Sequence, residues 1–267
     1  MRLARVSAVV LRQAYLMRGS PARVLPLVAW VAIDIVLWGF ITRYLNAITL
    51  GRFDFVPTLL GAVLLWDFFI RVMQGVTMAF LEDVWSRNFL NLFASPLSIS
   101  EYVGGLVLSS IATSAVGLVM MMVLAFTIFG LSFVAYGAML IPFLVVLFSF
   151  GIALGIAASA VVLRWGPASE WFVWPIPALL SPFAGVFYPV ATLPRWMQIA
   201  AHLLPPSYVF EGMRRVVAHG AVSGAALACG AALAVLDIFA ASWLFVHVHR
   251  RAVRTGLIAR YSAETVT

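Results

Sequence analysis

The sequence of 267 residues contains no lysine, a single cysteine and few charged side chains of any kind. Charged residues make up 10% of the chain, whereas a soluble globular domain carries about 25%. At 64% hydrophobic residues and a mean hydropathy of +1.05, the chain cannot cover itself with a water-facing surface. This composition excludes a soluble enzyme and a free-standing nucleic-acid binder, and the high hydrophobicity also excludes a disordered chain.

Two scarce residue types exclude particular sites. With only Cys229, the chain can form neither an internal disulfide nor a cysteine-based zinc site. Without lysine, it cannot contain the Gly-x-x-x-x-Gly-Lys-Ser/Thr loop that holds nucleotide phosphates. Its histidines lack metal-binding spacing, and no nucleophile stands with a base. We therefore expect no catalytic residue, no metal site and no cofactor in this chain.

Long apolar runs make up most of the sequence. A helix needs about 20 mostly apolar residues to cross a membrane, and six runs approach that length. They cover approximately residues 24–41, 57–81, 102–129, 136–163, 171–190 and 222–246. The fifth contains four prolines, which must kink or break its helix. We therefore predict an all-α polytopic membrane protein, with one transmembrane domain over residues 1–267.

The arginines predict the orientation of these spans, because cytoplasmic loops are enriched in basic residues. If the N-terminus is inside, eleven arginines fall in inside segments and five in outside segments. This count places both termini in the cytoplasm, which an even number of spans also requires.

An amphipathic helix is predicted before the first span, within residues 1–23. Apolar residues on one face of the 3–17 segment recur at spacings of three and four, while Arg5 and Arg12 fall on the opposite face. The apolar face consists of Leu3, Val6, Val10, Ala14 and Met17. Such a helix should lie on the cytoplasmic membrane surface with its arginines toward lipid phosphates. An ordinary positively charged lead-in is the alternative.

The connector between the second and third spans, residues 82–98, has a similar pattern. Its aromatic and apolar residues stand at i, i+4, i+7 and i+8, namely Trp85, Phe89, Leu92 and Phe93. This spacing predicts a short amphipathic helix that ends near Pro96. Glu82 and Asp83 are expected at its N-terminus, where the helix dipole favours negative charge. A passive interfacial connector would have the same pattern.

The segment 181–215 before the last span is rich in proline and glycine. Its apolar pieces are too short to cross a membrane and too apolar for a solvated loop, which predicts a re-entrant external hairpin. A role beside a translocation path and a role as a passive lid both fit this pattern.

Four charges fall inside predicted spans, where each is costly unless paired or hydrated: Asp34, Asp67, Arg71 and Asp237. Asp67 and Arg71 are one helical turn apart and should pair. The pair either lines a polar stretch of a path or orients the second span as a structural ion pair. Gly151 and Gly155 form a Gly-x-x-x-Gly face for close helix packing, within the chain or against a second copy.

Two of these segments together resemble a known family. The acidic pair, the aromatic connector 85–93 and Ser-Pro-Leu-Ser at 95–98 resemble membrane subunits of type 2 ATP-binding-cassette (ABC) exporters. The late stretches 181–189, 193–196 and 204–208 resemble the same family, and the resemblance extends over nearly the whole chain.

The resemblance implies a permease that couples ATP hydrolysis by separate subunits to outward transport of a lipid, drug-like or glycan-type substrate. The implied partners are two ATP-binding-cassette ATPase subunits that hold ATP and Mg²⁺, a second copy of this permease and membrane lipids, with no nucleic acid. The implied location is the bacterial cytoplasmic membrane.

The resemblance also implies roles for individual residues. ATPase coupling would fall on Glu82, Asp83, Trp85, Arg87, Asn88 and Phe89. The external gate would fall on Pro182, Phe183, Gly185, Phe187, Tyr188 and Pro189. An ion-coupled secondary transporter and an intramembrane lipid-modifying enzyme remain the alternatives.

Overall fold

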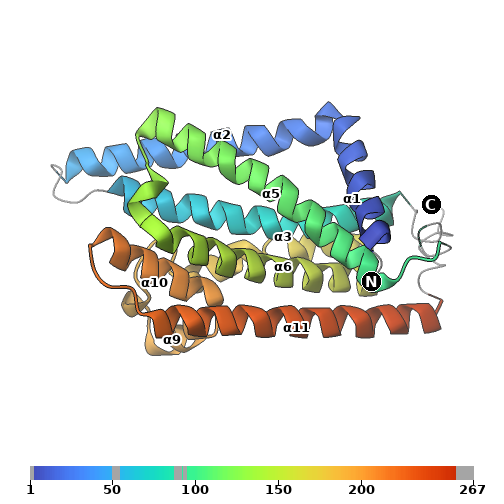
Figure 1. Cartoon of the computed structure of the whole chain (residues 1–267). Coiled ribbons are helices and arrows are strands. Elements are labelled where there is room, and N and C mark those ends of the chain that lie inside the picture. The colour runs from blue at the N-terminus through green and yellow to red at the C-terminus, as the bar shows by residue number, and fades with distance from the viewer. Residues whose placement is uncertain (1–2, 50–54, 87–91, 93–94, 257–267) are drawn as a thin grey trace.

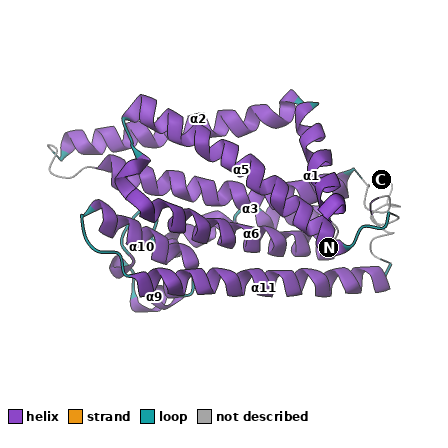
Figure 2. Ribbon diagram, viewed as in Figure 1, coloured by secondary structure: helices purple, strands orange, loops and turns teal. Residues whose placement is uncertain are grey.

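The computed structural model describes residues 3–49, 55–86, 92 and 95–256. In this part of the chain every regular element is a helix (Figure 2). The predicted all-α class is therefore confirmed.

Five described stretches are long and apolar enough to cross a membrane. They are Val28–Ile48, Val56–Trp85, Ile99–Phe129, Phe133–Trp165 and Gly224–Arg254. The helices that form them are α2 (Pro21–Ile48), α3 (Gly61–Trp85) with the preceding η1 (Val56–Leu60), α5 (Ile99–Phe129), α6 (Leu140–Trp165) with the preceding η2 (Phe133–Met139), and α11 (Gly224–Arg254). They correspond to five of the six predicted spans.

The predicted span over residues 171–190 is not a single helix. This region contains α7 (Glu170–Val173) and α8 (Ile176–Ala184), which are separated at Trp174 and Pro175. Pro175 has no N–H to continue the helical hydrogen bonding, and α8 ends at Gly185 with φ +70°. The nine residues of α8 extend only about 14 Å. The six-span count is therefore not confirmed.

The first helix and the two short helices before α11 lie at opposite ends of the bundle (Figure 1). The helix α1 (Leu3–Arg18) runs across the end at which α11 finishes, which we call the termini end. The helices α9 (Arg195–His202) and α10 (Pro205–Val217) lie at the other end, which we call the hairpin end.

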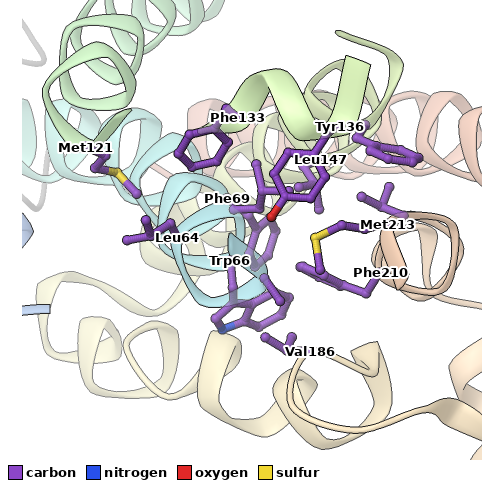
Figure 3. Close-up of a cluster of buried hydrophobic side chains, with 14 of the residues drawn as sticks. Leu64, Trp66, Phe69, Met121, Phe133, Tyr136, Leu147, Val186, Phe210 and Met213 are labelled. Carbon is purple, nitrogen blue, oxygen red and sulfur yellow. The ribbon is translucent and has the colours of Figure 1, made fainter. Parts of the chain in front are cut away.

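Two apolar clusters fill the core, one at each end. The termini-end cluster includes Phe80, Tyr102 and Phe245. At the hairpin end, Trp66 and Phe69 of α3 pack among residues of η2, α6 and α10 (Figure 3). The Trp66 ring lies 6.0 Å from that of Phe210 on α10, which attaches the hairpin end to the bundle.

The stretches containing α3 and α6 form the centre of the bundle. Their most apolar segments are 61% and 50% buried, against 17–22% for those containing α2, α5 and α11. Glycines allow the central pair to approach closely: a Cβ at Gly155 would lie 2.8 Å from the carbonyl oxygen of Met73. Thr77 also donates a hydrogen bond to the Gly155 carbonyl, at 3.3 Å. Gly151 and Gly155 therefore pack within the chain.

We expect Gly155→Ala to lower the free energy of unfolding by about 1–3 kcal/mol, because the new Cβ would also lie 2.8 Å from the Cβ of Val76. The measurement is equilibrium unfolding of the purified protein in mixed micelles. Gly224→Ala is the matched control, since a Cβ there meets no atom within 4 Å. Equal stability of the two variants would contradict the close α3–α6 contact.

Candidate functional site

The acidic pair lies at the end of α3. The prediction that Glu82 and Asp83 begin a separate helix is wrong, because α3 continues through Trp85. Phe80 and Leu81 before the pair and Val84 after it are buried, so the apolar face of α3 continues past the pair. A helix C-terminus carries partial negative charge, so carboxylates there need compensation from elsewhere.

Asp83 receives that compensation from two other helices. Its side chain is fully buried, and Arg12 of α1 donates to both carboxylate oxygens, with Nη1 3.0 Å from Oδ2. Tyr102 of α5 donates its hydroxyl to Oδ2 at 2.7 Å. The hydrogen bond to Asp83 raises the pKa of Arg12 above its usual value. We call this group the Asp83 clamp, since one carboxylate joins α1, α3 and α5.

A second ion pair joins α1 to α5. Arg5 Nη1 lies 3.4 Å from Glu101 Oε2, and Glu101 also accepts the Ser98 N–H at 3.0 Å in a capping box at the start of α5. The prediction that Arg5 and Arg12 face lipid phosphates is therefore wrong, because both bind carboxylates of this chain.

The buried face of α1 also differs from the predicted one. It consists of Val6, Val9 and Gln13, whereas Leu3 and Ala14 of the predicted apolar face are exposed. The helix lies directly on α5, since a Cβ at Gly105 would come within 2.5 Å of the Cβ of Val9.

The start of the connector is accessible. Trp85 is 48% exposed, directly after the buried Asp83 and Val84. Asp83 itself has no exposed surface for a partner while the clamp is formed. Arg87, Asn88 and Phe89 lie outside the described residues, so the predicted connector helix stays a prediction.

Within the spans, Asp67 and Arg71 form the predicted pair, with 2.7 Å between Oδ2 and Nε. Both side chains are nearly buried. Asp34 of α2 lies close enough to interact electrostatically with Asp67 and Arg71, and a Cβ at Gly117 of α5 would contact the Arg71 stem. This polar group therefore lies where α2, α3 and α5 meet. Asp237 lies partly exposed on α11 and has no hydrogen-bond or ion-pair partner among the described side chains.

An arginine organises the turn after α8 at the hairpin end. Arg214 of α10 donates to the carbonyl oxygens of Gly185, Val186 and Tyr188, the last two at 3.2 and 2.9 Å. Glu211 accepts from Arg214 at 3.2 Å and from the Val190 N–H at 2.7 Å. Burial lowers the pKa of Arg214.

Arg214 and Glu211 were missed as functional residues by sequence reasoning. The available signal was an acidic and a basic residue three positions apart, downstream of a turn rich in Pro and Gly. A carboxylate–guanidinium unit of this kind satisfies carbonyls that the broken helix leaves free.

The six predicted gate residues come together around the same turn. Pro182, Phe183 and Gly185 lie in or directly after α8, and Pro189 precedes η4 (Val190–Thr192). The Tyr188 hydroxyl donates to the Pro182 carbonyl at 3.1 Å.

Two aromatic contacts extend from this turn. The Phe187 ring stacks on Trp38 of α2 with centroids 5.4 Å apart, and Phe183 meets Trp196 of α9 edge to face. The turn therefore contacts both the transmembrane bundle and the short helices of the hairpin end.

A cavity of about 150 Å³ separates α10 from the start of α11. Its polar lining includes His202, Tyr208, Glu211 and Arg215. Burial and a hydrogen bond with Cys229 raise the pKa of Tyr208 to about 12. Among the described residues, no group of three His, Cys, Asp or Glu side chains could hold a metal ion.

The model of the ABC-2 type transporter family matches residues 7–217, which include most of α1, the Asp83 clamp, the intramembrane polar group and the hairpin end through α10. No curated protein matches the chain.

We expect Arg12→Gln to lower the free energy of unfolding by about 3 kcal/mol, because it leaves the buried Asp83 carboxylate without its cation. In a double-mutant cycle with Asp83→Asn, the coupling energy should be about 1–3 kcal/mol. Arg18→Gln is the control, since the exposed Arg18 has no ion-pair partner among the described residues. Additive effects in the cycle would contradict the clamp.

We expect Arg214→Gln to open the turn after α8, because carbonyls that it satisfies lose their donor. Amide hydrogen exchange at residues 185–190 should accelerate about 10- to 100-fold, as the loss of a charged hydrogen bond implies. Arg215→Gln changes the adjacent, exposed arginine and should leave this exchange unaltered. The same acceleration in both variants would show that Arg214 has no special role.

Proposed function

The chain belongs to the ABC-2 type transporter family, and from this premise we propose that it is the permease subunit of an ATP-driven exporter. The family implies partnership with an ATP-binding-cassette subunit, and the long apolar helices make the chain a multi-pass membrane protein. In this proposal two ATPase subunits hold ATP and Mg²⁺, two permease copies form the conduit, and nucleic acid has no part.

The observation that carries the proposal is the Asp83 clamp beside the exposed Trp85. Force applied by an ATPase to the connector reaches α3 directly at residue 85. Through Asp83 the same force reaches α1 by Arg12 and α5 by Tyr102. At the other end of the connector, Ser98 and Glu101 cap α5. A rigid joint of three helices can therefore convert motion at the connector into motion of the spans.

We also propose six crossings, with both termini in the cytoplasm. The end of α6 lies beside the end of α11, since Arg164 and Arg251 line one cavity, while α11 begins beside α10. The intervening chain must therefore return from the termini end to the hairpin end. In our proposal α7 and α8 make this crossing as a broken helix, and the arginine-rich termini end faces the cytoplasm of a bacterial cell.

The substrate path in this proposal passes the polar group of Asp34, Asp67 and Arg71 and leaves beside the turn at residues 182–189. The polar group supplies a buried ion pair within otherwise apolar spans. The mostly unburied faces of α2 and α5 provide surface for the second copy and for lipid. A lipid, drug-like or glycan-type substrate suits such a path.

Co-expression with an ATP-binding-cassette ATPase and co-purification in mild detergent tests the proposal. We expect the ATPase to be retained, and Trp85→Ala to weaken its binding about tenfold or more, as truncation of an interfacial tryptophan does. Trp196→Ala is the matched control, because it removes an exposed tryptophan from the hairpin end.

Failure to retain any ATPase would refute the proposed function, and equal loss in both variants would refute the docking position. Transport driven by an ion gradient without an ATPase would instead support a secondary transporter.

A further inference from the structure

A second cavity, of about 250 Å³, lies between the ends of α6 and α11. Arg164 and Trp165 of α6 line one side. Arg251 of α11 lines the other, with Val248 and Ala252 as a buried apolar floor. Neither arginine has a carboxylate partner among the described residues. Two uncompensated positive charges from different helices therefore share one cavity.

Carbonyl groups at the helix ends beside this cavity accept hydrogen bonds from donors other than the two arginines. The Thr255 hydroxyl donates to the Arg251 carbonyl at 2.9 Å, and the Gly166 N–H donates to the Val162 carbonyl at 2.8 Å. The Arg164 guanidinium instead lies 6.0 Å from the centroid of the Trp165 ring. An arginine in a last helical turn offsets the helix dipole, but this effect requires no cavity shared between two helices.

Exposed aromatic residues place the cavity at the membrane–water interface. Trp165 is the last residue of α6, Trp171 and Phe172 lie in the following α7, and each of the three is at least 65% exposed. Tryptophans collect at the level of lipid headgroups. A basic cavity between helices at this level is of the kind that holds the headgroup of an anionic lipid.

We propose that this cavity binds the phosphate of an anionic phospholipid headgroup, with Arg164 and Arg251 as its two cationic ligands. Because Val248 and Ala252 carry no charge, the two arginines alone attract the negatively charged headgroup. This site is independent of the ATPase, of the substrate and of the direction of transport.

Native mass spectrometry of the full-length protein in detergent, with added phosphatidylglycerol or phosphatidylethanolamine, tests this site. We expect preferential retention of phosphatidylglycerol, and about 30-fold weaker retention in the double variant Arg164→Gln/Arg251→Gln. Arg164→Lys/Arg251→Lys keeps both charges and should retain the lipid. The control Arg250→Gln/Arg254→Gln removes the same charge from the end of α11 but does not touch the cavity lining.

Three results would overturn the site. Equal loss in the cavity and control double variants would show diffuse attraction to the basic end of α11. Unchanged retention in the cavity variant would exclude the two arginines as ligands. Complete displacement of the lipid by an excess of inorganic phosphate would show that the cavity selects free phosphate rather than a phospholipid.

Discussion

The buried carboxylate of Asp83 imposes the constraint on which the termini end of the bundle depends. A charge in an apolar interior is tolerated only with an opposite charge and full hydrogen bonding, and removal of its partner costs several kcal/mol. Arg12 and Tyr102 supply both requirements, and they come from helices on either side of α3 in the sequence. The carboxylate therefore fixes α1, α3 and α5 relative to one another, two residues before α3 ends.

Ion pairs also occur within the spans and at the hairpin end. Asp67 and Arg71 form an ion pair within the spans, close to Asp34 of α2. Glu211 and Arg214 hold the turn after α8 against α10. Apolar packing between helices is weakly directional in a membrane, whereas a hydrogen-bonded ion pair specifies one geometry. Few charges occur in this chain, and these groups lie at the termini end, within the spans and at the hairpin end.

Local patterns predicted those features that depend on local physics. Apolar runs predicted five long helices, the i,i+4 spacing predicted the Asp67–Arg71 pair, and the prolines marked the region where α7 and α8 are separated. The partners of Arg5 and Arg12 were not predictable, because an arginine on a polar helix face suits a lipid phosphate and a distant carboxylate equally well. Arg12 and Asp83 are 71 positions apart, and no periodicity reports a contact of that range. Asp83 was predicted at the start of a new helix. It lies instead near the end of α3, because the apolar face of that helix continues past it without a break.

In our proposal the Asp83 clamp transmits motion from the connector to the rest of the bundle. The most direct measurement uses Cys229, the single cysteine of the chain, which is exposed near Tyr208 of the hairpin end. In the complex with its ATPase, the rate at which a maleimide labels Cys229 is followed by mass spectrometry with and without a non-hydrolysable ATP analogue. If the Asp83 clamp transmits motion from the connector, the analogue changes this rate severalfold in the wild type. In Arg12→Gln the rate stays constant, although that variant still binds the ATPase and hydrolyses ATP. The same nucleotide-dependent change in both proteins would contradict the role of the clamp.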